Sequence, residues 1–118
     1  MTFPRRGDIY LVEFDPTRGH EIQKTRPAVV IQNDVSNRYS PITIVAAVSS
    51  HFGNPPFPRE VLVGPGGNTG LSQASAVILN QIRFIDRQRL LKRIGRVDGP
   101  TLRRVDDALK ISLGLVEL

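Results

Sequence analysis

Cysteine is absent from this 118-residue chain, which excludes several kinds of site at once. Without thiols there is no disulfide, no thiolate metal site and no cysteine nucleophile. The two histidines, His20 and His51, are too few for an ordinary zinc site, because carboxylates would have to supply most of the ligands. The acidic residues are scattered along the chain rather than grouped, so a magnesium-type carboxylate cluster stays open only as a less favoured alternative. We therefore predict a site without a metal ion or another cofactor.

Long apolar runs are also absent. None approaches the roughly 20 residues that a membrane-spanning helix needs, and the start of the chain leads directly into a strand pattern without an apolar signal segment. Hydrophobic residues make up 40% and charged residues 23% of the chain, which is typical of a soluble globular protein. We expect a single domain over residues 1–118, located in the cytoplasm and without a membrane partner.

Lysine is scarce, whereas arginine is abundant. Of the 16 basic residues, 13 are arginines and 3 are lysines, and the net charge is +5. The guanidinium fork matches a phosphate group bidentately, whereas lysine is a point charge. The skew indicates either a polyanionic partner or a solubilising surface. The same two interpretations, a track for a nucleic-acid backbone or a solvated basic face, stay open for one basic segment that Asp86 alone offsets: Arg83, Arg87, Arg89, Lys92, Arg93 and Arg96.

Short β-branched runs with turn signals between them predict a mainly β protein with helices (α+β), built as a small β-barrel closed by a C-terminal helix. The polar stretch 33–41 has room for one helical turn. The glycine-rich stretch 64–70 lacks the lysine and Ser/Thr of a phosphate loop, so we interpret it as a hairpin connection. Asp98-Gly-Pro-Thr opens the helix, whose apolar stripe is Leu102, Val105, Leu109, Ser112, Leu113 and Val116. The strands are expected at 8–14, 28–32, 42–49, 60–63, 75–80 followed by 81–86, and 91–97, with an irregular proline-rich loop at 52–58.

One loop between two expected strands gathers groups that can cleave a phosphodiester. His20 can act as an acid or a base, and Glu21 can accept a proton if burial raises its pKa. Arg26, next to Pro27, can hold a phosphate and stabilise the charge of the transition state. Ser49 ends a strand and can donate a hydrogen bond to the same phosphate. The alternative is that these residues are solvated loop groups and that Arg26 pairs with an acid.

At these residues the chain resembles the MazF/PemK family of toxin endoribonucleases from bacterial toxin–antitoxin systems. The similarity covers nearly the whole chain, and the order and spacing of the matching segments make it specific. The segments are Arg6-Gly-Asp-Ile-Tyr10, Asp15-Pro-Thr-Arg-Gly-His-Glu21, Thr25-Arg-Pro-Ala-Val-Val30, Gln32-Asn-Asp34, Asn37-Arg38, Val45-Ala-Ala-Val-Ser49, Gln81-Ile-Arg83 and Ile85-Asp86.

The resemblance implies an SH3-like barrel of the CcdB/MazF type and a homodimer whose grooves hold single-stranded RNA. It also implies metal-independent cleavage, in which the ribose 2′-OH attacks the adjacent phosphate and leaves a 2′,3′-cyclic phosphate and a 5′-OH. A MazE-like antitoxin with an acidic extended tail would be the protein partner. Catalytic roles fall on Arg26, Ser49, Glu21 and His20, and RNA contacts are expected from Thr17, Arg18, Lys24, Asn33, Arg38, Ser50, His51, Gln81 and Arg83.

The chain departs from some relatives at Ile78 and Asn80, where those relatives carry charged residues, so the second proton-transfer partner is open. Two other functions compete with RNA cleavage. A gyrase-inhibiting toxin of the CcdB type relies on a tryptophan-bearing C-terminus, and this chain has no tryptophan. A non-catalytic RNA-binding barrel would keep the arginines without needing Arg26 beside His20 and Glu21. The cleaved RNA sequence depends on the shapes of loops such as 50–59, which composition does not fix.

Overall fold

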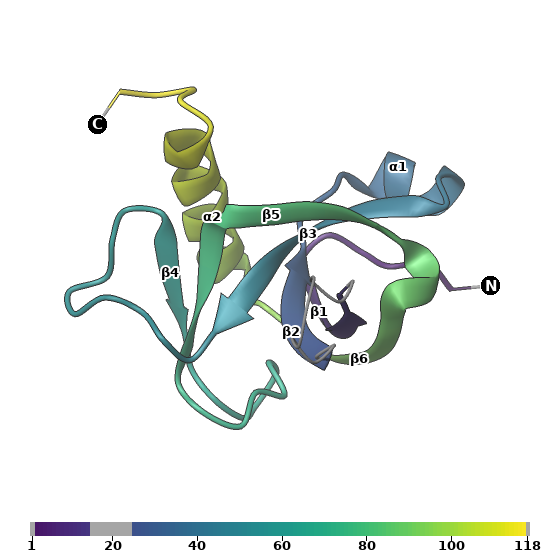
Figure 1. Cartoon of the computed structure of the whole chain (residues 1–118), viewed down its shortest axis with the longest axis horizontal. Coiled ribbons are helices and arrows are strands. Elements are labelled where there is room, and N and C mark those ends of the chain that lie inside the picture. The colour runs from purple at the N-terminus through teal and green to yellow at the C-terminus, as the bar shows by residue number, and fades with distance from the viewer. Residues whose placement is uncertain (1, 15–24, 118) are drawn as a thin grey trace, which may run out of the picture.

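Six strands form one antiparallel sheet in the order β4-β5-β3-β2-β1-β6, and a long C-terminal helix packs against it (Figure 1). The computed structural model describes residues 2–14 and 25–117. No helix in those two ranges is long and apolar enough to cross a membrane. The elements are β1 (Asp8–Glu13), β2 (Thr25–Val30), α1 (Asp34–Tyr39), β3 (Ile42–Ser49), β4 (Glu60–Val63), β5 (Ser75–Asp86), the 3₁₀ turn η1 (Arg87–Arg89), β6 (Leu90–Arg96) and α2 (Gly99–Ser112).

The predicted mainly β architecture with a C-terminal helix is confirmed, with two differences that concern the site. β2 begins at Thr25 rather than at residue 28, so Arg26 belongs to the strand. The two strand segments predicted at 75–80 and 81–86 are one strand. The pairing of β5 with β3 jumps from Ile78 to Ile82, so a bulge absorbs the three residues between them without ending the strand.

The predicted barrel differs from the structure in one respect, because within the described residues the sheet does not close into a ring of paired strands, and β4 and β6 are its edges. The glycine-rich β4–β5 connection joins these edges instead, because the Arg96 backbone N–H donates to the Asn68 carbonyl at 2.8 Å. Gly70 has a φ of +68°, and a Cβ there would overlap the carbonyl oxygen of Ile94. Glycine at position 70 therefore allows this hairpin connection between β4 and β5 to lie against β6.

Two apolar clusters lie on opposite faces of the sheet because strand side chains alternate between faces. α2 covers the larger cluster with Val105 and Ala108. The smaller cluster lies on the other face and consists of Val12, Ala28, Val30, Val45 and Ile85, with Tyr10, Phe14 and Leu90 packed against it.

Asp98 caps the first turn of α2 by accepting a hydrogen bond from the Thr101 backbone N–H at 2.8 Å. Hydrogen bonds from the Thr101 side chain and from its backbone N–H hold the pKa of the Asp98 carboxyl below its ordinary value. The helix ends at Ser112, so Leu113 and Val116 lie beyond it and are exposed rather than part of the buried stripe that the sequence predicts. Gly114 takes a positive φ of 72°, which suits a helix end.

Replacing Asp98 by alanine is expected to lower the melting temperature at neutral pH, because the Thr101 N–H loses its acceptor. A carboxyl with a lowered folded pKa stabilises the fold above its unfolded pKa and loses that effect as the pH falls through the folded value. The difference in melting temperature between wild type and Asp98→Ala is therefore expected to shrink below about pH 4. Circular dichroism melts measure it, with Glu117→Ala as an exposed acidic control. A difference that stays constant into strong acid would contradict the capping role.

Candidate active site

Three strands begin or end at the same end of the sheet. β2 begins, β3 ends and β5 begins there because each is antiparallel to its neighbour. Ala28 pairs with Ala47, so extending the register by two residues on each strand places Arg26 across from Ser49. Ser49 in turn pairs with Ala76 near the start of β5. The register therefore brings together two residues that are far apart in the sequence and that were both predicted to be catalytic.

A cavity of about 380 Å³ opens at this end of the sheet. Four of the predicted site residues line it: Arg26, Ser49, Ser50 and His51. Sequence reasoning missed the opposite wall, which consists of Leu71, Ser72, Gln73 and Ser75, just after the glycine-rich connection. The polar run Ser72-Gln-Ala-Ser75 before an apolar strand was the available signal, but only the pairing of β5 with β3 shows which cavity it borders.

Local hydrogen bonds fix the backbone around His51. The Ser49 Oγ accepts from the His51 backbone N–H at 3.0 Å, and the Ser49 hydroxyl proton stays available to donate to a ligand. Two residues further on, the Gly53 N–H donates to the Glu60 carboxylate at 3.1 Å. The same carboxylate accepts from the Phe57 N–H at 2.8 Å. The loop that carries His51 is thus held on both sides.

The described lining of the cavity favours an anion. Arg26 supplies a guanidinium, and the lining contains no aspartate or glutamate among the described residues. Hydroxyl groups of serines and the amide of Gln73 add neutral hydrogen-bonding groups. Such a set can hold a phosphate with its charge compensated by Arg26 and its oxygens hydrogen-bonded. In the ranges 2–14 and 25–117, no group of three or more histidine or acidic side chains is arranged to hold a metal ion.

Arg83 lies further along the same face of the sheet. Arg83 pairs with Val45, and opposed residues of an antiparallel pair lie on the same face of the sheet. Because side chains alternate along β3, Ser49 lies on the same face as Val45, and so does Arg26 across from it. The Arg83 guanidinium lies 5.2 Å from the centroid of the Phe14 ring. Gln81 falls in the bulge of β5 and is exposed, outside the cavity lining. Residues predicted to contact RNA therefore extend along β5 beyond the cavity.

The structure does not bring two other predicted RNA-binding residues to the cavity. Asn33 and Arg38 belong to the connection between β2 and β3, at the opposite end of both strands. Asn33 caps α1 by accepting from the Ser36 N–H at 2.8 Å, and the Arg38 guanidinium lies 5.3 Å from the Tyr39 ring centroid. The predicted residues Thr17, Arg18, His20, Glu21 and Lys24 lie outside the described residues.

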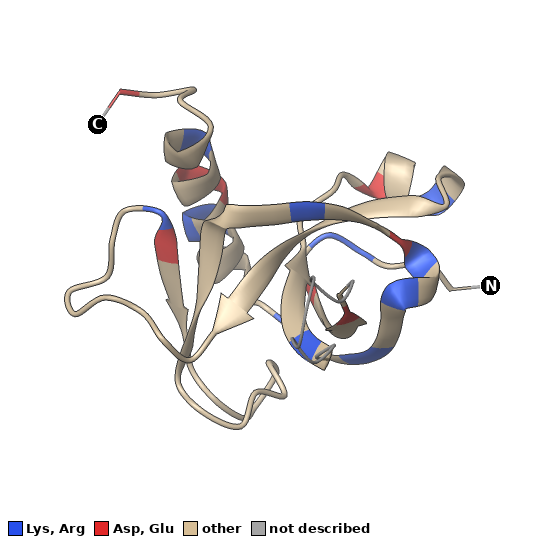
Figure 2. Ribbon diagram, viewed as in Figure 1, with Lys and Arg blue, Asp and Glu red and all other residues tan. Residues whose placement is uncertain are grey.

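The basic segment after Gln81 is less unbalanced than its sequence indicates (Figure 2). Asp8 has only 4% of its side chain exposed, and its carboxylate is 3.1 Å from Arg93 Nε and 3.3 Å from Arg96 Nη1. Arg89 also lies within 4.0 Å of the Glu13 carboxylate. The interpretation that Asp86 alone offsets this segment was wrong, because acids from β1 are brought to it by the pairing of β1 with β6.

From the sequence, three aromatic residues in or beside loops could either seal the core or stack on unpaired bases. All three, Phe52, Phe57 and Tyr39, are exposed, so they do not seal the core. The Arg59 guanidinium lies 4.6 Å from the Phe57 ring centroid. The other interpretation, stacking on unpaired bases, stays a prediction.

Fold and cavity together define a small β protein with a cavity suited to an anion at the ends of its central strands. Residues 5–113 match the family described as "PemK-like, MazF-like toxin of type II toxin-antitoxin system". The chain belongs to this family, which confirms the predicted family.

Known relatives agree with this assignment. The chain is 40% identical over 113 residues to "Endoribonuclease EndoA" of Bacillus subtilis (strain 168), covering 96% of this chain and 97% of that protein. It resembles the solved structure of an endoribonuclease from a mycobacterial species, with a TM-score of 0.79, 21% identity and coverage of 100% of this chain and 98% of the other. A MazF structure from Deinococcus radiodurans gives a TM-score of 0.76 and 26% identity over 97% and 99% of the two chains.

Proposed function

We propose that this chain is a sequence-specific, metal-independent endoribonuclease that cleaves single-stranded RNA as the cytoplasmic toxin of a toxin–antitoxin system. The 2′-OH attacks the adjacent phosphate and leaves a 2′,3′-cyclic phosphate and a 5′-OH. The endoribonuclease class rests on the family match and on the relative named EndoA. The mechanism rests on one observation, which is that the register places Arg26 and Ser49 on the wall of one cavity.

Arg26 holds the scissile phosphate in this proposal. Its fork reaches two phosphate oxygens at once, and its charge opposes the negative charge that builds up as the 2′-oxygen adds to phosphorus. Ser49 donates its hydroxyl proton to a phosphate oxygen, because its Oγ lone pair already accepts from the His51 N–H. The resemblance assigns proton transfer to Glu21 and His20. A carboxylate that is ionised at neutral pH can serve as the base for the 2′-OH.

The proposal includes an antitoxin partner. A MazE–MazF complex from Deinococcus radiodurans has a TM-score of 0.77 and 25% identity to this chain, over 96% of this chain and 97% of that chain. For this chain we propose an antitoxin with an acidic extended tail, because the net charge of +5 favours a polyanionic segment. Such a tail would compete with RNA for the basic surfaces.

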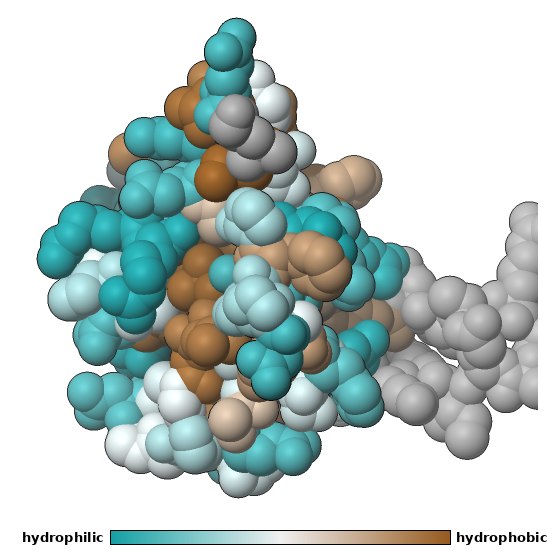
Figure 3. Space-filling view, turned by 90° about the vertical axis from the view of Figure 1, so that its left-hand side faces the viewer, coloured by the Kyte–Doolittle hydropathy of each residue, from teal (hydrophilic) through white to brown (hydrophobic). Residues whose placement is uncertain are grey.

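The homodimer is also part of the proposal, and the face formed by β4 and α2 supports it. β4 is an edge strand, so one row of its backbone groups is not paired in the described sheet. Figure 3 shows apolar side chains gathered in a band over this side of the molecule. Leu62 of β4 is 47% exposed, and Leu115, after α2, is 70% exposed. Exposed apolar area of this kind marks interaction sites.

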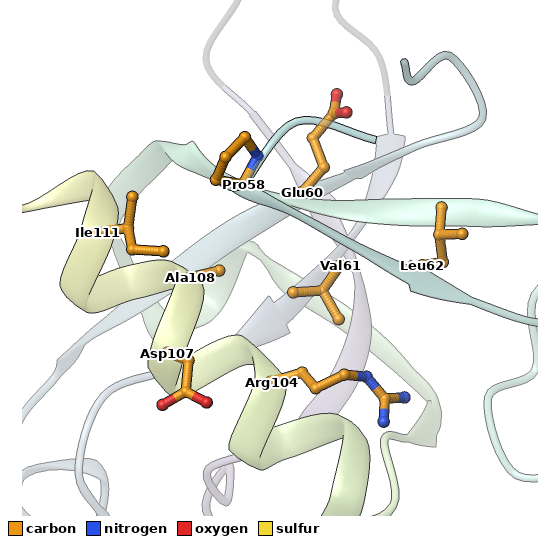
Figure 4. A pocket seen from close by; sticks show the side chains of 8 residues that line it. All are labelled: Pro58, Glu60, Val61, Leu62, Arg104, Asp107, Ala108 and Ile111. Atoms are coloured by element: carbon orange, nitrogen blue, oxygen red, sulfur yellow. The ribbon is translucent and has the colours of Figure 1, made fainter. Parts of the chain in front are cut away.

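A groove of about 380 Å³ runs between these two elements (Figure 4). Its apolar floor includes Val61 from β4 and Ala108 and Ile111 from α2, and its border carries Arg104 and Asp107. Groups of both signs on one patch can pair with their two-fold copies, which is what an isologous contact requires. A second copy of this chain is therefore the proposed occupant.

Replacing Arg26 by alanine is expected to slow RNA cleavage about 10²–10³-fold, because the main electrostatic stabilisation of the transition state is lost. The assay incubates purified protein with long single-stranded RNA in EDTA and follows product ends. Arg26→Lys keeps the charge without the fork and is expected to be intermediate. Arg103→Ala removes an exposed arginine of α2 and should leave the rate unchanged. If wild-type protein leaves the RNA intact, the enzyme proposal is wrong. If Arg26→Ala binds and cleaves RNA as well as wild type does, only the role of Arg26 is wrong.

Replacing Ser49 by alanine is expected to reduce kcat/KM about 10- to 100-fold, the value of a hydrogen bond to a charged group. Since the substitution also removes the acceptor for the His51 N–H, the melting temperature is measured alongside. Ser49→Thr keeps the hydroxyl and should restore most of the rate. A Ser49→Thr variant as slow as Ser49→Ala would argue against the hydroxyl as the phosphate contact.

Replacing Leu62 by aspartate is expected to shift the protein from twice the 13.1 kDa chain mass to that mass in light scattering coupled to size exclusion. A buried unpaired charge opposes association across an apolar contact. Val35→Asp is the matched control, since Val35 is 72% exposed on α1 and away from the β4–α2 face. A dimer that survives Leu62→Asp would place the contact elsewhere.

A further inference from the structure

We propose that His51 is a catalytic residue of the cleavage reaction, the general acid that protonates the departing 5′-oxygen. This inference rests on the proposed endoribonuclease function. It gives His51 a chemical role in addition to the RNA contact that the family resemblance implies. Three observations carry it: the shared cavity, the proton-transfer capacity of its described lining, and the fixed backbone on both sides of His51.

The reaction moves two protons. The 2′-OH loses one proton to a base as the O2′–P bond forms. The P–O5′ bond then breaks, and the 5′-oxygen takes a proton to leave as a hydroxyl. No water is consumed, and no electron is transferred. Without an acid the leaving group would depart as an alkoxide, which is a poor leaving group at neutral pH, so an acid beside the 5′-oxygen lowers the barrier.

Among the described residues that line the cavity, one side chain can supply that proton. Arginine stays protonated in proteins, so Arg26 can stabilise charge but cannot release a proton usefully. Serine hydroxyls and the Gln73 amide hydrogen-bond without changing protonation state near neutral pH. Ile78 on the same face is apolar and buried. An imidazole ordinarily changes charge between pH 5 and 8, which suits both gaining and releasing a proton.

The position of His51 fits an acid rather than a distant RNA contact. It lies two residues after Ser49, and the bond from its backbone N–H to Ser49 Oγ ties it to the residue proposed to touch the phosphate. Its side chain is exposed and lines the same cavity as Arg26. A phosphate held between Arg26 and Ser49 therefore has the imidazole beside it. The Gly53 contact with Glu60 limits how far the loop can move away.

The test uses a leaving group that needs no acid. Cleavage sites are first mapped on long RNA with the wild-type protein. An oligonucleotide of that sequence is then made with sulfur in place of the bridging 5′-oxygen. The P–S bond breaks to a thiolate, and since a thiol ionises near pH 8.5 the thiolate leaves without protonation. His51→Ala is expected to cleave ordinary RNA about 10²–10⁴-fold more slowly than wild type but the sulfur substrate at close to the wild-type rate.

Two variants separate the acid role from other roles. Arg26→Ala is expected to be slow on both substrates, because it acts on the phosphate charge and not on the leaving group. His51→Gln keeps a hydrogen-bonding side chain without an exchangeable acid and should behave like His51→Ala, with its melting temperature showing that it folds. Gln88→Ala, exposed on η1, is the unaffected control.

The possible results separate the acid role of His51 from the endoribonuclease function on which it rests. Full activity of His51→Ala on ordinary RNA, or equal slowing on both substrates, would overturn the acid role while leaving the endoribonuclease intact. A wild-type protein that leaves all RNA whole would overturn both.

Discussion

The register of β2 against β3 is the constraint on which the site depends. Because Ala28 pairs with Ala47, the start of one strand and the end of the other stand side by side, and Arg26 comes to face Ser49. If β2 slipped by one residue against β3, Arg26 would turn to the face covered by α2 and would no longer share a face with Ser49. The apolar cluster on the site's own face, with Val30 opposite Val45, opposes that slip because it would expose buried residues. The same packing that stabilises the sheet therefore also aligns the two groups that we propose to bind the phosphate.

The glycine-rich connection 64–70 positions the remaining part of the cavity lining, residues 71–75. Gly66 N–H donates to the Leu71 carbonyl at 2.7 Å, and the Thr69 hydroxyl donates to the carbonyls of Gly64 and Gly66, so the turn is cross-linked internally. Its approach to β6 also holds it from outside, since a Cβ at Gly95 would overlap the carbonyl oxygen of Asn68. Leu71, directly after the turn, is buried and starts the wall that contains Gln73. Glycine is thus used here for close backbone approach, not for binding phosphate.

Local sequence signals predicted most elements but only part of the site. The bounds of β3 and β4 could be predicted because β-branched runs end at clear turn signals, and Asp98 with Pro100 marked the start of α2. The early start of β2 was missed, because Pro27 is a poor strand former and only pairing with β1 shows that residues 25–27 are strand. The wall at 71–75 and the neutralising contact of Asp8 depend on pairings between strands distant in sequence, which no local pattern specifies.

Arg93 and Arg96 differ from Arg26 in their described acidic neighbours. Arg93 and Arg96 share the buried carboxylate of Asp8, and a buried charge of this kind must be compensated. Part of their positive charge therefore offsets Asp8 and stabilises the β1–β6 pairing. The described wall around Arg26 holds no acid, so the charge there can act on a phosphate. Among the described residues, the positions of the acidic side chains therefore distinguish arginines with a neighbouring carboxylate from Arg26, whose described surroundings in the cavity have none. The cavity that contains Arg26, Ser49 and His51 has no acid in its described lining, whereas Arg93 and Arg96 share the carboxylate of Asp8.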